Sequence, residues 1–176
     1  TITASAVFNA LDITGTPFEV GQNGELLKNT NTKIKLMISG LKESDNENSL
    51  QSLITYGDFD ALFTGDAGTK AFEKIKNEIP HEIDYLKVGH HGAKNTTSSQ
   101  MLEKLTPKLA IISTGANRFG HPSKQTLENL HLAHVKYYRT DYEHAVKVKT
   151  DGKTIKIYTY QTKGRKFIQR ETIDAD

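Results

Sequence analysis

The sequence predicts a protein of the α/β or α+β class, with a mixed sheet, crossover helices and a layered core. Strand-like segments alternate with amphipathic helical segments between residues 59 and 114, which is the pattern of parallel strands joined by helices. A hairpin precedes this stretch and short strands follow it, so antiparallel pairs are expected as well. Hydrophobic residues make up 36% of the 176 residues, which is enough for a packed core and excludes wholesale disorder.

The first predicted strands precede the alternating stretch. Residues 33–38 alternate polar and apolar side chains, as a half-buried strand does. Residues 49–56 and 59–64 are predicted as a pair of strands joined by Gly57-Asp58, a dipeptide typical of hairpin turns. Upstream of them, residues 4–11 are expected to form a helix that is followed by turns.

The middle of the chain predicts three helices and two strands. Phe72, Ile75 and Ile79 share one face of the first helix, and Thr97 or Ser98 is suited to cap the second. The second strand is continuously apolar, as expected of a strand that is buried on both faces. In chain order the elements are a helix over 69–79, a strand over 83–88, a helix over 98–105, a strand over 109–114 and a helix over 123–131.

The rest of the chain predicts short strands, with Asp151-Gly152 as the clearest hairpin signal. These strands are expected over 135–138, 145–148, 154–160 and 166–168.

Composition excludes several classes of function. Lys and Arg number 23 against 21 Asp and Glu, so the net charge of +2 argues against a polybasic nucleic-acid or membrane adhesive. Cysteine is absent, which excludes a disulfide framework and a thiolate zinc site. No apolar run approaches the roughly 18 residues that a membrane span needs, so no span is expected in this chain.

Residues able to bind metal follow three of the predicted strands. Asp66 follows the strand over 59–64, the pair His90-His91 lies between two glycines, and His121 lies in the loop after the buried strand. Because the carboxyl ends of such strands meet at one sheet edge, these side chains are expected to converge. One carboxylate with several imidazoles favours zinc, manganese or iron over magnesium or calcium. Such an ion would polarise a phosphoryl or acyl oxygen and lower the pKa of bound water to about 7.

Each of these segments has a structural alternative. Asp66 could cap the following helix, and His121 could be an exposed side chain before a helix-start proline. His90 and His91 could be surface residues; on an extended chain they would point to opposite sides, so that one faces an ion and the other donates a hydrogen bond or proton. The other histidines have no comparable setting and are predicted to be surface or structural residues: His81, His131, His134 and His144.

These motifs resemble a known superfamily. Residues 46–50 (Asn-Glu-Asn-Ser-Leu), the Tyr56-Gly57 hairpin and residues 62–66 (Leu-Phe-Thr-Gly-Asp) resemble the middle of a metallo-β-lactamase-fold hydrolase. Residues 83–92 (Ile-Asp-Tyr-Leu-Lys-Val-Gly-His-His-Gly), with Gly120-His121-Pro122 downstream, resemble the subgroup found in ComEC-type competence proteins and their soluble relatives. The phosphorylcholine esterases of the superfamily carry a similar histidine cluster.

The resemblance implies an αββα sandwich, of which this chain is half or more, and a phosphoesterase site with two ions of zinc or manganese. Asp66 corresponds to the bridging aspartate and His91 to a metal-ligating histidine. His90 corresponds to a neighbour that binds metal or substrate phosphate. His121 corresponds to a residue that contacts the substrate or a metal-ligating side chain. Both are predicted to be catalytic.

Basic residues near these motifs are candidates for substrate binding. Arg118 could contact an anion, and Lys94 with Lys87 and Lys124 could form a local basic rim. The alternative is that they are ordinary solvated side chains.

One family motif, His-x-His-x-Asp-His, is missing, and no histidine precedes His81. The chain therefore resembles the C-terminal half of the domain. Residues 1–32 are predicted to be a lead-in from a missing N-terminal half, residues 33–160 the metallo-β-lactamase-like C-terminal portion, and residues 161–176 a C-terminal extension without an assigned role. A lone half would expose an apolar face, so the missing half is the expected partner and the chain by itself is expected to be inactive or incomplete.

The sequence is compatible with three functions. The first is a metal-dependent phosphoesterase or nuclease-like hydrolase, for which the resemblance implies a phosphoester substrate such as DNA. The second is a small-molecule phosphodiesterase similar to phosphorylcholine esterase. The third is a sandwich module that has lost its site. The presence of Asp66, His90, His91 and His121 together favours catalysis.

Overall fold

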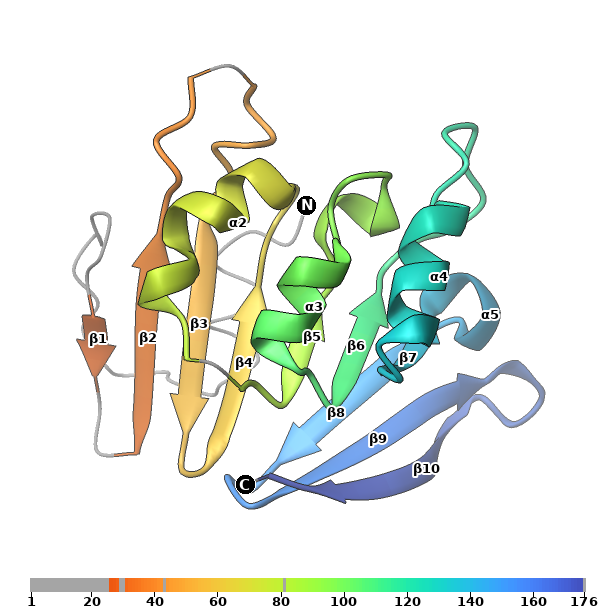
Figure 1. Cartoon of the computed structure of the whole chain (residues 1–176). Helices are drawn as coiled ribbons and strands as arrows, with labels where there is room; N and C mark the ends of the chain where they lie inside the picture. The colour runs from red at the N-terminus through yellow and green to blue at the C-terminus, as the bar shows by residue number, and fades with distance from the viewer. Residues whose placement is uncertain (1–25, 29–30, 43, 81, 176) are drawn as a thin grey trace.

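The computed structural model describes residues 26–28, 31–42, 44–80 and 82–175 (Figure 1). Seven strands form one sheet in the order β1-β2-β3-β4-β5-β6-β7, and three form a second sheet in the order β10-β9-β8. The strands of the first sheet are β1 (Leu26–Lys28), β2 (Thr32–Met37), β3 (Gln51–Tyr56), β4 (Phe59–Phe63), β5 (Tyr85–Lys87), β6 (Leu109–Ile112) and β7 (Lys136–Arg139). Those of the second are β8 (Val146–Thr150), β9 (Thr154–Gln161) and β10 (Lys166–Asp174). The helix expected over 4–11 lies outside the described residues.

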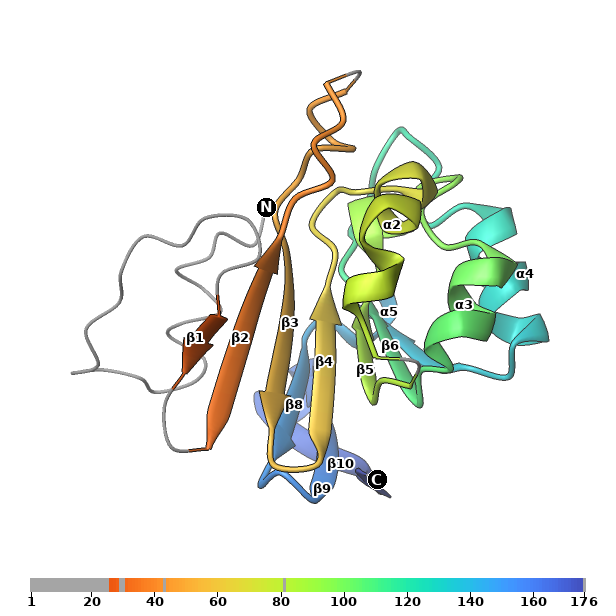
Figure 2. The same ribbon diagram turned by 60° about the vertical axis from the view of Figure 1, so that its left-hand side comes forward.

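The seven-stranded sheet is mixed, as predicted. Strands β1 to β4 pair antiparallel, whereas β4 to β7 pair parallel. The parallel strands are joined through helices that lie on one face of the sheet, which Figure 2 shows from the side. These are α2 (Thr69–Ile75), α3 (Ser99–Leu105) and α4 (Lys124–Leu132). A short helix, α5 (Thr140–Glu143), follows β7. The predicted α/β class is confirmed.

The strands after α4 only partly follow the expected antiparallel pairing. Strand β7 adds to β6 in parallel, because α4 provides one more crossover connection. Strands β8, β9 and β10 then form an antiparallel sheet of their own. β10 is three times as long as the strand predicted over 166–168, so most of the segment without an assigned role belongs to this sheet.

Two apolar cores flank the seven-stranded sheet. Along β3, Leu53 packs into the core beneath the helices, and its neighbour Ile54 packs into the core between the two sheets, as strand alternation requires. Ile155 and Ile157 of β9 are fully buried in that second core. The described residues thus supply three layers of the predicted sandwich: helices, sheet and sheet.

A lone half of the sandwich was expected to expose an apolar face. Within the described residues that expectation is wrong, because the three-stranded sheet covers this face of the seven-stranded sheet. The large apolar side chains that remain exposed are scattered: Leu50, Phe119, Leu132, Tyr142 and Phe167. Among the described helices, none has the length and apolar composition that a membrane crossing requires.

Two hairpin turns, one from each sheet, contact each other at the end of the sheets opposite to the N-termini of the helices. The Gly57-Asp58 turn contacts the Asp151-Gly152 turn, and the Asp58 amide donates to the Gly152 carbonyl at 2.7 Å. Gly152 has a φ of +89°, and a Cβ atom there would lie 2.9 Å from the Tyr56 carbonyl oxygen. Glycine is therefore required at this contact by both backbone conformation and space.

Strand β5 contains a buried lysine. Lys87 is 8% exposed, and its ammonium donates to the Val88 carbonyl at 2.9 Å. Burial lowers the pKa of Lys87 to about 8, while the nearby Asp66 carboxylate opposes the shift. Below the folded-state pKa the charged group is buried at a cost in stability.

We expect Gly152→Ala to lower the free energy of unfolding by about 1–3 kcal/mol, because the new methyl group is strained and meets the Tyr56 carbonyl. Gly115→Ala is the matched control: nothing lies within 4 Å of a Cβ there, and the change should stay within about 0.5 kcal/mol. Urea unfolding measures both. Equal effects of the two substitutions would contradict the proposed docking of the turns.

We expect Lys87→Met to raise the free energy of unfolding at pH 7 by roughly 1–3 kcal/mol, since it removes a buried charge. In the unsubstituted protein the unfolded chain binds more protons than the folded one between the folded pKa of about 8 and the ordinary value of 10.5, so stability should rise with pH across that interval. The variant should lose this rise. A lower stability of the variant at pH 7 would show that attraction to Asp66 outweighs the cost of burial.

Candidate metal and phosphoester site

The loops that follow β4, β5 and β6 pack against one another through their backbones. The His90 amide donates to the Gly65 carbonyl at 3.1 Å, and the Ser123 amide donates to the Gly92 carbonyl at 2.8 Å. Gly89 makes the first contact sterically feasible, because a Cβ atom there would lie 2.6 Å from the Ala67 carbonyl oxygen. The structure therefore brings the three predicted segments together at one edge of the sheet.

The two adjacent histidines form a tight turn. His90 and His91 have φ values of 43° and 56°, in the left-handed region that costs a non-glycine residue free energy. The Ala93 amide closes the turn by donating to the His90 carbonyl at 2.9 Å. The expectation of an extended chain with imidazoles on opposite sides is wrong, because the Gly65 carbonyl and this closing bond hold the pair in a turn.

Three imidazoles gather at this edge. The ring centroids of His90 and His91 are 6.1 Å apart, and those of His90 and His121 are 5.4 Å apart. The Phe119 ring stacks on His121 at 5.8 Å and is 81% exposed. His121 therefore joins the pair from a different loop.

His91 has its ring orientation fixed from behind. Its Nδ1 atom lies 2.7 Å from the Ser113 carbonyl oxygen. A carbonyl can only accept, so Nδ1 carries the proton and donates it. In the neutral imidazole the Nε2 lone pair is then free, which is the arrangement that metal-ligating histidines use.

His90 shows the opposite arrangement. The side-chain amide of Asn46 lies 3.4 Å from His90 Nδ1, and an amide nitrogen can only donate. The neutral ring therefore carries its proton on Nε2, which makes that atom a donor. His90 is thus arranged to donate a hydrogen bond to an oxygen atom, and His91 to provide a lone pair.

His121 has a buried ring nitrogen without a partner. Its Nδ1 atom is inaccessible to solvent and makes no hydrogen bond within the described structure. Burial, reinforced by the neighbouring His90 and His91, lowers the pKa of His121 below its ordinary value. The neutral imidazole is therefore favoured near pH 7.

Asp66 does not cap the helix that follows it. Glu47 does so instead: its Oε2 accepts from the Ala71 amide at 2.9 Å and from the Gly68 amide at 3.3 Å. A Cβ atom at Gly68 would lie 2.5 Å from Glu47 Oε1, so glycine leaves room for this carboxylate. The capping alternative is wrong, and half-buried Asp66 faces the charge of Lys87.

The predicted substrate-binding residues lie on exposed loops. Lys94 and Arg118 are exposed, and no hydrogen bond or ion pair joins either to the histidines in the described residues. Lys124 is exposed and pairs with Glu128 at 3.2 Å. His131, His134 and His144 are exposed, as predicted. His81 lies outside the described residues.

No three His, Asp or Glu side chains in the described ranges are arranged to hold one metal ion. Two residues of the strand-end loops nevertheless suit a metal. His91 offers a free lone pair on an oriented ring, and Asp66 offers a carboxylate that is not used by the helix. This donor set of nitrogen and oxygen fits zinc or manganese.

Sequence reasoning missed three residues that hold the histidines and the neighbouring helix in place. Asn46 and Glu47 lie in the polar loop before β3, and Ser113 acts through its backbone carbonyl. Asn46 and Glu47 belong to a stretch that carries the family resemblance, which was the available signal. The role of Ser113 has no sequence signal, because every residue has a carbonyl.

Comparison with known proteins finds curated relatives among competence proteins. The chain is 37% identical to ComE operon protein 3 of Bacillus subtilis over 100 residues, which is 56% of this chain and 13% of that protein. It is 40% identical to Recombination protein 2 of Haemophilus influenzae over 89 residues, 50% of this chain and 11% of that protein. It is 30% identical to competence protein ComA of Neisseria gonorrhoeae over 100 residues, 55% and 14% respectively. The matches thus span a small fraction of the relatives' length.

Two further comparisons add little. No protein-family model matches the chain. A solved structure of a CmlA beta-hydroxylase mutant matches with a TM-score of 0.45 and 11% identity, over 66% of this chain and 31% of that one, which is too weak a similarity to support an argument. The three relatives confirm the resemblance to ComEC-type competence proteins found in the sequence: about half of the chain is similar to a part of such proteins, and the structure has the predicted mixed α/β architecture.

Proposed function

We propose that this chain carries part of the active site of a competence-related, metal-dependent phosphoesterase that acts on nucleic acid as a nuclease-like hydrolase. The observation that carries the proposal is the pair of opposite hydrogen-bond partners at the Nδ1 atoms of two histidines in one turn, a carbonyl oxygen at His91 and a side-chain amide nitrogen at His90. These partners favour a free lone pair on Nε2 of His91 and an N–H group on Nε2 of His90. A phosphodiester site needs both, a ligand for a cation and a donor to the phosphoryl oxygens.

In this proposal Asp66 and His91 hold a divalent ion of zinc or manganese, and a second ion belongs to the complete site. The ion, when bound, supplies Lewis-acid activation of the phosphoryl group and of water. Two protein ligands are too few for a stable catalytic site. The remaining ligands come from the N-terminal half of the same domain, a proposal supported by the much greater length of the curated relatives.

The other residues act on the substrate. His90 donates its Nε2 proton to a non-bridging phosphate oxygen, and the turn that holds it fixes the direction of that bond. His121 stays neutral near pH 7 and contacts the substrate or the leaving oxygen from the neighbouring loop. Lys94 and Arg118, which are long and exposed, reach phosphates on either side of the scissile bond.

We expect Asp66→Ala in the full-length protein to abolish phosphodiester hydrolysis and to lower the bound zinc or manganese content. The physical reason is the loss of a carboxylate ligand. Metal content is measured by emission spectroscopy after dialysis. Asp58→Ala, an exposed aspartate in the β3–β4 turn, is the control and should keep both properties. Equal metal content in the two variants would end the assignment of Asp66.

We expect His90→Ala and His91→Ala to have different effects. His90→Ala should lower kcat by about a hundredfold or more and spare most of the metal, because it removes a donor to the substrate. His91→Ala should reduce metal binding itself. His134→Ala, at an exposed position, should leave kcat and metal content unchanged. Complete metal loss in His90→Ala would refute the division of roles.

A further inference from the structure

The outer face of the three-stranded sheet combines basic and aromatic side chains. Ile155 and Ile157 of β9 point into the core between the sheets, so the alternate residues of β9 lie on the opposite side. Their cross-strand partners on β8 and β10 share that side, because paired residues lie on one face. We call this set the basic–aromatic face: Lys147, Lys149, Lys156, Tyr158, Tyr160 and Phe167.

The rings of the basic–aromatic face form a connected cluster. The Lys147 ammonium lies 4.7 Å from the Tyr158 ring centroid and 4.5 Å from that of Phe167. Tyr160 and Phe167 contact each other edge to face, with centroids 5.4 Å apart. Phe167 is 39% exposed, although a phenylalanine gains nothing from contact with water. The cluster therefore presents π surfaces and a cation to solvent.

Positive charge is concentrated around this face. Residues 146–174, which form the three-stranded sheet and its turns, contain eight Lys and Arg against three Asp and Glu, a net charge of +5, in a chain whose total is +2. The remaining residues thus carry −3. The near-neutral total, which argued against a basic surface, is the sum of two parts of opposite sign. A field of this kind attracts anions to one side of the molecule.

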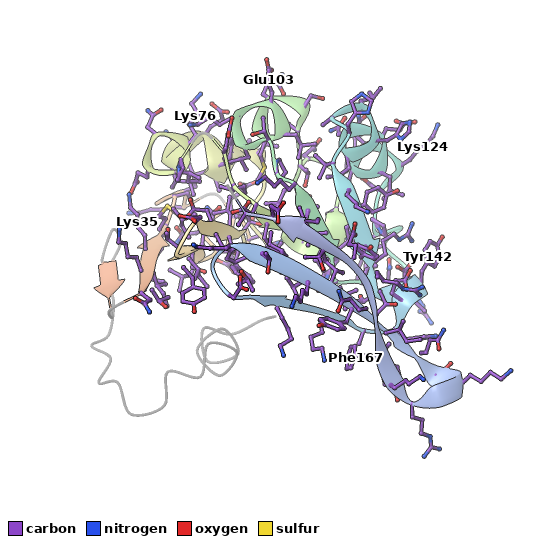
Figure 3. The ribbon with its side chains drawn as sticks, turned by 90° about the horizontal axis from the view of Figure 1, so that it is seen from below. Lys35, Lys76, Glu103, Lys124, Tyr142 and Phe167 are labelled. Carbon is purple, nitrogen blue, oxygen red and sulfur yellow. The ribbon has the colours of Figure 1, made fainter. Side chains whose placement is uncertain are left out.

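The lysines of the face are not neutralised. Within the described part of the chain, none of Lys147, Lys149 and Lys156 pairs with a carboxylate. Arg170 at the β10 bulge, in contrast, pairs with Glu143 at 3.4 Å and donates from Nε to Thr159 Oγ1 at 2.7 Å. Figure 3 shows Phe167 on the side of the molecule opposite to Glu103 and Lys124 of the helical layer.

We propose that the basic–aromatic face binds single-stranded nucleic acid. Unpaired bases stack on Phe167, Tyr160 and Tyr158, and the flanking lysines contact the phosphates. A duplex does not fit this chemistry, because its bases are already stacked and paired. The face lies on a different layer from the histidine loops, so binding requires neither a metal nor the proposed hydrolysis.

Fluorescence anisotropy with a labelled oligothymidylate tests the proposal, using the whole chain in EDTA so that hydrolysis does not contribute. We expect Phe167→Ala to weaken binding at least about fivefold, through the loss of stacking. Lys149→Glu should weaken binding and reduce the slope of log K against log salt by about 0.7. Lys74→Glu makes the same charge change at an exposed position of helix α2 and should leave the affinity within about twofold of that of the unsubstituted protein. Thermal unfolding verifies that all three variants are folded.

Three results would overturn the proposal. The first is unchanged affinity in both Phe167→Ala and Lys149→Glu. The second is an equal affinity for a duplex of the same length that depends on the same side chains. The third is binding to phosphatidylserine vesicles and not to the oligonucleotide, with the vesicle affinity lowered by Phe167→Ala and Lys149→Glu. If the full-length protein bound the oligonucleotide but hydrolysed no phosphodiester, only the proposed function would be contradicted.

Discussion

Backbone hydrogen bonds between neighbouring strand-end loops are the constraint on which the site depends. The His90 amide is tied to Gly65, and the Ser123 amide to Gly92. These bonds link three crossover units whose loops would otherwise be separate in sequence and independent in position. They also hold His90 and His91 in left-handed backbone conformations, which cost free energy. The loops can pack this closely because Gly89 and Gly92 have no Cβ atom. The imidazole cluster is thus a product of backbone geometry more than of side-chain attraction.

The two faces of the molecule separate two kinds of chemistry. Three imidazoles gather where the parallel strands end, and cations with aromatic rings gather on the three-stranded sheet. The seven-stranded sheet and the apolar core between the two sheets separate them. The paired turns at Gly57 and Gly152 fix how the second sheet docks.

Features set by local chemistry were predictable from the sequence. Ser98 and Ser123 cap their helices by accepting from backbone amides three residues later, and Gly57-Asp58 forms the expected hairpin turn. The α/β class followed from the same patterns. The candidate residues Asp66, His90, His91 and His121 could be selected because strand-end position is readable from hydrophobic periodicity.

Features set by tertiary contacts were not predictable. Glu47 caps a helix that begins more than twenty residues later, which no local pattern indicates. The parallel addition of β7 depends on how α4 packs. The turn at His90-His91 depends on a carbonyl from another loop. The basic–aromatic face required the register of three strands, because the net charge of the whole chain conceals it.

The most direct measurement is a crystal structure of the full-length protein grown with zinc, with anomalous scattering recorded at the zinc edge. We expect an ion about 2.0–2.1 Å from His91 Nε2, with the bond from His91 Nδ1 to the Ser113 carbonyl retained. Anomalous density only at exposed histidines such as His134, or a His91 ring turned away from Ser113, would contradict it.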